Sequence, residues 1–330
     1  MKKTTKAWVG IIALAIGAPS GYFLLHQEDA IEAKDVKKMS EKEQKAYLDK
    51  LSEYVSSGQK PSTVEKDLAM NIAKLSKDNA SEAFYIFLYG IAIEQEKQMK
   101  NYETVSDNLI LSFNKGEFTP GVKASYDKVE DQAVKGYLNE LKRQFLFVED
   151  DGQGLYLTQD VAGLEKKYGS FFNDGLKAVM DIRIKNQTSP YVSASGTKYN
   201  LKKNLERILW IQGKKTSWEN TIYQEEALAI QETAYADFFG VTQDTYFEQK
   251  DGKDVMKESV KEEMWHLAKE YANSFMADDI LAYMEELEAD GFEKKDDQNV
   301  VYGRMNERFG SKADVQTPFA KAEQQEAESE

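Results

Sequence analysis

This sequence offers few nitrogen or sulfur ligands for a metal, because it contains two histidines, His26 and His266, and no cysteine. A zinc site of the His-Glu-x-x-His type needs two histidines on one helix and cannot form here. Glu262, His266 and Glu270 follow one another at steps of four, which would place them on one helical face. A solvated face with a histidine between two carboxylates has the same spacing. We therefore expect no metal and no cofactor, with Glu262, His266 and Glu270 as weak candidates only.

Serine and lysine motifs of the kind found in penicillin-binding enzymes occur at three places. Ser195 to Lys198 has the form Ser-x-x-Lys, Ser106 to Asn108 has the sequence Ser-Asp-Asn, and Lys215 to Ser217 approaches Lys-Thr-Gly. The order of the motifs is wrong for these enzymes, and the third motif lacks its glycine. Ser-x-x-Lys also recurs elsewhere in the chain, so the pattern carries little information. We expect no nucleophilic serine.

Paired carboxylates could hydrolyse glycosidic bonds, and the chain has 57 Asp and Glu residues from which to form a pair. Glu285, Glu286 and Glu288 are one such group, although their spacing is also typical of a solvated helix face. No glycine-rich phosphate loop is present, and Asp150 to Gly154 lacks the ligand spacing of a calcium loop. We predict no catalytic residue, and a carboxylate-based hydrolase remains an alternative.

The start of the chain has the pattern of a membrane anchor. Three lysines precede an uncharged segment from Ala7 to Leu25, which at about 1.5 Å per residue can just cross a hydrocarbon core of ~30 Å. Aromatic residues near both ends suit the membrane interface, and a proline inside the segment would kink it. The residues of this predicted anchor are Lys2, Lys3, Lys6, Trp8, Pro19, Tyr22 and Phe23.

Charge predicts the orientation of this anchor. Lysines precede it and acidic residues such as Glu28 follow it, so the N-terminus is expected in the cytoplasm and everything after His26 outside. A signal peptide has the same opening, but cleavage after Ala15 would leave too short an apolar core, and cleavage after Ala18 would place Pro19 just past the bond. We expect a single-pass protein of the cell membrane, with secretion after cleavage as the alternative.

The composition limits the classes of partner that the chain could bind and the kind of organism that it suits. The chain has 43 Lys and Arg against the 57 acidic residues, a net charge of −14, which repels nucleic-acid phosphates. We therefore expect no nucleic-acid partner. An exported chain without cysteine has no disulfides and must be stabilised by packing, which suits a Gram-positive bacterium. Aromatic residues make up 12% of the chain, enough for a proper core and for surface contacts with a protein partner.

Helical periodicity dominates the part after the anchor, which contains few prolines and repeats apolar residues at steps of three and four. Ala83 to Ile93 is apolar or aromatic on every face yet too short to cross a bilayer, so it predicts a buried central helix. A shorter segment from Val105 to Phe113 follows separately. Apolar spacing also predicts a helix from Val122 to about Arg143 and a further helical stripe from Met256 to Phe275. Three capping boxes predict helix starts: Ser40 with Glu43, Ser62 with Glu65, and Thr216 with Glu219.

One β-hairpin interrupts the helices. Gln144 to Glu149 alternates apolar and polar residues, Asp150 to Gly154 has turn composition, and Leu155 to Thr158 is again extended in character. The expected fold is an all-α, multi-helix extracytoplasmic ectodomain with this hairpin, preceded by one transmembrane helix. The predicted regions are 1–35 for the basic end, anchor and link, 36–143 for an N-terminal helical half, 144–310 for the hairpin and C-terminal helical half, and 311–330 for an acidic disordered tail.

These patterns favour a non-enzymatic interaction protein at the outer face of the membrane, serving assembly, scaffolding or client binding. Its expected partners are the membrane, through the N-terminal helix, and a protein at the cell surface. Two other classes stay open: a cell-wall hydrolase that uses paired carboxylates, and a module that binds a small ligand in a helical cavity.

Overall fold

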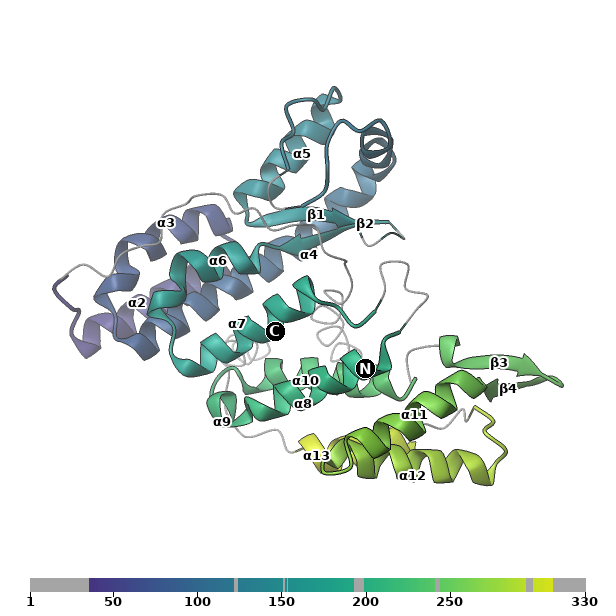
Figure 1. Ribbon diagram of the computed structural model, residues 1–330. Coiled ribbons are helices and arrows are strands. Elements are labelled where there is room, and N and C mark those ends of the chain that lie inside the picture. Colours follow the sequence, from purple (N-terminus) through teal and green to yellow (C-terminus); the bar gives the residue numbers. More distant parts are fainter. Residues whose placement is uncertain are drawn as a thin grey trace, which may run out of the picture. The chain divides into compact units, whose positions relative to one another are not determined.

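The computed structural model describes residues 36–121, 124–150, 152, 154–192, 199–240, 244–294 and 299–310 (Figure 1). The described residues form 12 α-helices and two small two-stranded antiparallel sheets. The predicted helical character is therefore confirmed, whereas the prediction of a single hairpin was wrong. The predicted anchor and the predicted tail lie outside the described residues. No helix among the described residues combines the length and the apolarity needed to cross a bilayer.

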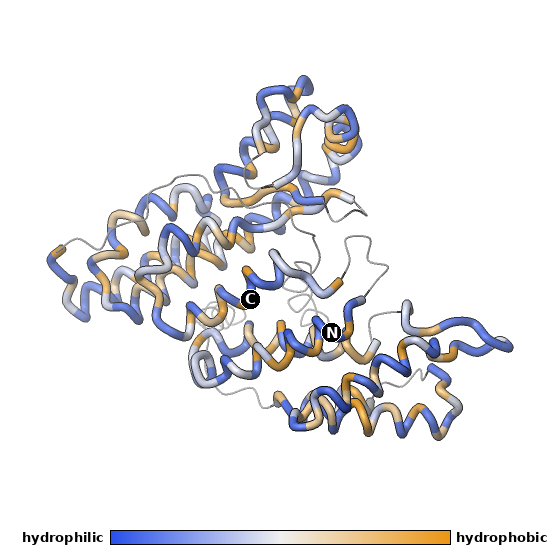
Figure 2. Tube along the Cα trace, in the orientation of Figure 1, coloured by the Kyte–Doolittle hydropathy of each residue, from blue (hydrophilic) through white to orange (hydrophobic). Residues whose placement is uncertain are grey.

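The described chain forms two compact units, residues 36–189 and 190–310, which are treated separately below. The chain passes from the first unit to the second at Ser189 and Pro190, whereas the sequence predicts a boundary at the hairpin. That predicted boundary stays a prediction. In both units, polar (blue) and apolar (orange) residues alternate along the helices (Figure 2), as expected where one face packs inward.

The first unit contains six helices and one hairpin, joined by two short 3₁₀ turns, Ile72–Lys74 and Gly169–Phe171. In chain order its elements are α2 (Glu41–Ser56), α3 (Pro61–Asn71), α4 (Lys77–Asn114), α5 (Gln132–Arg143), β1 (Leu146–Asp150), β2 (Leu155–Gln159), α6 (Val161–Tyr168) and α7 (Asp174–Thr188).

Helix α4 forms the core of this unit, as its apolar composition predicts. Phe84 and Phe87 have no exposed surface, and the ring of Phe84 lies 4.5 Å from that of Phe172 and 5.4 Å from that of Tyr168. Gly90 lets α2 approach closely, because a Cβ atom there would lie 3.1 Å from Val55 Cγ2. The prediction of a buried helix over residues 83–93 is confirmed.

The same helix corrects a second expectation. The sequence predicts a separate short segment at Val105 to Phe113, but α4 is one continuous helix of 38 residues. The polar stretch between the two apolar runs stays helical because Glu94 and Gln98 are buried and hydrogen-bonded to each other, Gln98 Nε2 lying 2.7 Å from Glu94 Oε1. Because Glu94 and Gln98 are polar, the sequence pattern does not show that this face of the helix is buried.

Of the three predicted capping boxes, only the first is present. The side chain of Ser40 accepts a hydrogen bond from the backbone of Glu43, and the Glu43 carboxylate accepts one from the backbone of Ser40. Helix α3 instead begins at Pro61 without a side-chain cap. Glu219 lies at the end of the short helix α9 (Lys215–Trp218), so the box predicted to begin with Thr216 was also wrong.

The predicted hairpin is confirmed, with Glu149 opposite Tyr156 in the register of β1 and β2. Helix α5 is shorter than the sequence pattern indicates, because it begins at Gln132, where the side chain of Asp131 accepts hydrogen bonds from the backbone of Ala133 and Val134. Residues 124–131, which the pattern included in that helix, are irregular. Tyr126 is nevertheless buried, so this side chain packs into the unit from an irregular segment and not from a helix.

The second unit contains α8 (Leu201–Gly213), α9, α10 (Gln224–Phe238), a 3₁₀ turn (Asp244–Tyr246), β3 (Phe247–Lys250), β4 (Lys253–Met256), α11 (Glu258–Glu270), α12 (Phe275–Ala289) and α13 (Asn299–Phe309). Helices α8 and α10 pack together through buried polar groups, where Asn204 Nδ2 donates to the carbonyl of Ala234 at 3.0 Å. Tyr191 OH donates to Asp237 Oδ2 at 2.7 Å, and burial, with the Asp237 charge, raises the pKa of Tyr191 well above its ordinary value.

The hairpin β3–β4 was not predicted. Its turn residues Asp251 and Gly252 both have positive φ, 53° and 81°, as a two-residue type I′ turn requires. The predicted apolar stripe from Met256 to Phe275 is divided accordingly, since Met256 belongs to β4 and Phe275 begins α12.

Candidate interaction surface

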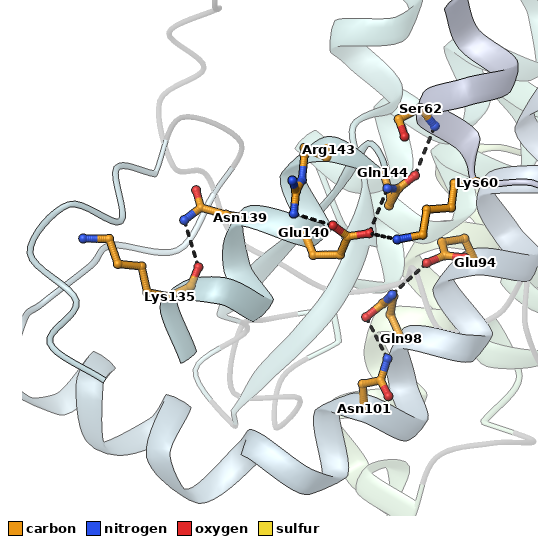
Figure 3. A network of polar contacts seen from close by, with 10 residues as sticks. All are labelled: Lys60, Ser62, Glu94, Gln98, Asn101, Lys135, Asn139, Glu140, Arg143 and Gln144. Atoms are coloured by element: carbon orange, nitrogen blue, oxygen red, sulfur yellow. Dashed lines mark hydrogen bonds and ion pairs between the residues drawn. The ribbon is translucent and has the colours of Figure 1, made fainter. Parts of the chain in front are cut away.

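The second half of α4 is held by a polar network on one of its faces (Figure 3). Asn101 Nδ2 donates to Gln98 Oε1 at 3.1 Å, and the backbone carbonyl of Gln98 accepts a hydrogen bond from Tyr137 OH, on α5, at 3.1 Å. Burial raises the pKa of Tyr137, which keeps its hydroxyl protonated as a donor. These contacts attach α4 to α5.

The hairpin holds the same part of α4. Tyr102 OH donates to the carbonyl of Leu155 at 2.8 Å, and Gln95 Nε2 donates to the carbonyl of Leu157 at 3.0 Å. Gln159 Nε2 in turn donates to Gln95 Oε1 at 2.9 Å. Because three side-chain hydrogen bonds join the hairpin to α4, the otherwise marginal two-stranded sheet has a rigid support.

A second part of the network joins α5 to the start of α3 (Figure 3). The Glu140 carboxylate accepts from Lys60 Nζ at 2.6 Å, from Arg143 Nη2 at 2.6 Å and from Gln144 Nε2 at 3.0 Å. Gln144 Oε1 accepts from the backbone of Ser62 at 3.1 Å. The hydrogen bond from Lys60, aided by that from Gln144 and by the two positive charges, lowers the pKa of Glu140.

The opposite face of α4 exposes apolar side chains. Met99 and Ile110 are each 42% exposed, and Leu111 is 55% exposed. Met99 and Ile110 are eleven residues apart, slightly more than three full turns, so they lie on the same side of the helix. Leu111 lies about 100° further round. We call Met99, Ile110 and Leu111 the α4 surface.

The sequence contains a signal for this surface that its apolar periodicity obscured. Leu109, Ile110 and Leu111 are consecutive, and consecutive residues of a helix point about 100° apart. One of them can face the core without the others, and Leu109 does so with no exposed surface. A run of three apolar residues on a helix that is buried on one side therefore implies exposed ones.

The weak metal candidates lie on α11. His266 Nδ1 is 3.6 Å from Glu270 Oε2, the His266 side chain is 74% exposed, and Glu270 also forms an ion pair with Lys202. Within the described ranges, no group of three or more potential metal ligands is close enough to hold an ion. Glu262 thus does not complete a metal site with His266 and Glu270.

The other chemical candidates belong to different parts of the chain. Residues 195–198 of the Ser-x-x-Lys motif lie outside them, as do all the predicted anchor residues. Ser106 to Asn108 belong to α4 in the first unit, and Lys215 to Ser217 belong to α9 in the second. Glu285 and Glu288 are exposed on α12.

Comparison with known proteins gives no match: no family model, no curated protein and no solved structure matches this chain. Any functional conclusion therefore depends on the residues themselves.

Proposed function

We propose that this chain is a membrane-anchored interaction protein whose external part binds another protein through the α4 surface. The N-terminal segment would anchor it with its N-terminus in the cytoplasm. The partner would be a protein at the outer face of the membrane, in an assembly, scaffold or client-binding role.

The exposed apolar side chains of α4 carry this proposal. Leu111 is more than half exposed on a helix whose other face is held by α5 and the hairpin. Burial of such side chains by a partner would gain roughly 25 cal/mol for each Å² of apolar surface. A rigid helix also loses little conformational freedom on binding, which favours affinity. The exposed charged residues Lys100, Glu103 and Asp107 lie between the apolar ones around the helix, so the partner would have to offer polar groups beside its apolar contact.

The test is photo-crosslinking in living cells with the full chain. A photoreactive amino acid replaces Asp107, which is exposed and lies between Ile110 and Leu111 around the helix. The matched control replaces Glu53, an exposed residue of α2. We expect a protein partner to crosslink at position 107 and not at position 53.

A second comparison tests the apolar contact itself. Leu111→Glu should lower capture at position 107 by about 30-fold, the effect of losing a contact worth about 2 kcal/mol. Asn108→Glu, an exposed change on the same helix, should leave capture unchanged. Equal capture by both variants, or none at position 107, would contradict the proposal. Lysis of purified cell wall by the full chain would favour the hydrolase instead.

A further inference from the structure

Glu149 is a carboxylate at a closely packed point of the first unit. Its Oε2 atom is inaccessible to solvent and accepts no hydrogen bond from the described residues. It lies near the end of β1, opposite Tyr156 on β2. A buried acceptor without a donor is costly, and more costly when it carries charge.

The carboxylate lies where the hairpin contacts the chain that follows α4. The backbone of Gly121 donates to the carbonyl of Val148 at 2.8 Å, and Gly121 has a φ of 120°. A Cβ atom built on Gly121 would lie 3.8 Å from Glu149 Oε2. The Glu149 carboxylate therefore lies beside the hydrogen bond that holds Gly121 to β1.

Aromatic packing extends from this point to the end of α4. Tyr126 is 5% exposed, and its ring lies 6.1 Å from that of Phe118. The Phe118 ring lies 6.1 Å from that of Phe113, in the last turn of α4. Burial raises the pKa of Tyr126 to about 12, and the negative charge of Glu149 contributes to that increase.

Few charges compensate Glu149. Burial, together with the charge of the neighbouring Asp150 carboxylate, raises its pKa to about 7. The titratable groups that act on it are Asp150, on its own strand, and Tyr126, from the chain that packs on β1. Among the described residues, no lysine or arginine forms an ion pair with it.

We propose that Glu149 makes the contact of β1 with Gly121 and Tyr126 proton-dependent, so that acid tightens this contact and alkali loosens it. In the neutral form the carboxyl can donate its own proton and carries no buried charge. In the ionised form the charge remains buried without a described cation. The external pH would thereby regulate the order of the chain next to the last turn of α4.

The direction follows from proton linkage. A carboxyl group with a raised pKa in the folded state binds its proton more tightly there than in the unfolded state. Its stabilising effect is fully present below its ordinary pKa of about 4.5 and is lost as the pH rises through about 7. The contact should therefore be tightest in mild acid and weakest above pH 8.

Hydrogen exchange of the full chain in detergent tests this directly. Native protein and Glu149→Gln are compared at pH 5 and pH 8.5 in peptides that cover Gly121, Tyr126 and β1. Comparison at equal pH removes the intrinsic pH dependence of exchange. At pH 8.5 the variant should exchange more slowly than native protein by at least roughly tenfold, since each unit of the pKa increase is a factor of ten in the equilibrium. At pH 5 the two should differ far less.

Two further variants keep the test decisive. Asp150→Asn retains Glu149 but removes its negative neighbour, so the pKa of Glu149 should fall to a value set by burial alone. The pH at which exchange accelerates should therefore move below the native midpoint. Glu117→Gln is the matched control, because the hydrogen bond from the Glu130 backbone lowers the pKa of Glu117, which stays ionised across this range. A Glu149→Gln effect of equal size at both pH values, no effect at either, or a Glu117→Gln effect of the same kind would overturn the proposal.

Discussion

Arg308 donates hydrogen bonds to both oxygens of the Asp279 carboxylate, among them one from Nη2 to Oδ1 at 3.0 Å and one from Nε to Oδ2 at 3.2 Å. Asp279, on α12, has no exposed surface, whereas the Arg308 side chain, on α13, is 37% exposed. Tyr235 OH also donates to Asp279, at 3.1 Å, and the Phe309 ring packs 5.3 Å from that of Tyr235. The last described helix is thus joined to the second unit by a buried charge as well as by aromatic packing.

Arg308→Met should therefore destabilise the second unit. Asp279 would keep Tyr235 and the longer contact with Arg304 at 3.5 Å, so the expected loss is about 2 kcal/mol, as for one hydrogen bond to a charged group. Urea unfolding followed by tryptophan fluorescence measures it. Glu307→Gln, an exposed change on the same helix, is the control, and equal stability of the two variants would show that the pair contributes nothing.

Two glycines should respond in opposite directions to the same kind of change. Gly90→Leu should cost about 1–3 kcal/mol, because its side chain would meet Val55 across the contact of α2 with α4. Gly136→Ala should instead stabilise by about 1 kcal/mol, since it lies in α5 with nothing within 4 Å of an added Cβ. Thermal unfolding of both variants measures these changes. Destabilisation by Gly136→Ala would contradict the open surroundings of that residue.

The capping box at Ser40 makes a further pair of variants informative. Ser40→Ala should cost about 1 kcal/mol, because it removes the acceptor for the Glu43 backbone at the start of α2. Ser62→Ala should cost much less, since α3 has no side-chain cap. Chemical denaturation separates the two cases. A larger loss for Ser62→Ala would restore the capping box predicted from the sequence.

Glu140 should contribute to stability in a pH-dependent way. Its pKa is lowered, first by the hydrogen bond from Lys60, so its contribution is present above about pH 4.5 and is lost as the pH falls through the lowered value. Unfolding midpoints measured from pH 7 to pH 2 should decrease more steeply for native protein than for Glu140→Gln. Parallel curves would mean that the network in Figure 3 has no net electrostatic effect.

The proposed localisation and membrane orientation can be tested by protease digestion. Because lysines precede the predicted span and acidic residues follow it, protease added to intact spheroplasts should digest the chain after His26. A cytoplasmic protein followed in the same sample should stay intact as a control. Protection of the chain until the cells are lysed would contradict the orientation, and release of an intact fragment without protease would favour cleavage and secretion.

Local sequence determined much of the helical architecture of the described residues. The stretch from Ala83 to Ile93 is apolar on every face, so burial was its only favourable environment, and Ser40 with Glu43 specifies a helix start within four residues. The first hairpin followed from its turn composition. Asp251-Gly252 is a local signal for the second hairpin, which the neighbouring helical stripe had obscured.

Only the tertiary structure decided the features that depend on distant partners. The polar stretch of α4 is continuous helix because Tyr137 and the hairpin, far along the chain, satisfy its buried polar groups. Asp279 differs in no local way from an exposed acidic residue until Arg308 and Tyr235 surround it. The exposure of Leu111 likewise depends on which face α5 covers. The spacing of apolar residues indicates which residues share one face of a helix within a few turns. Hydrogen bonds between residues far apart in the chain produce no regular spacing, so the sequence pattern does not reveal them.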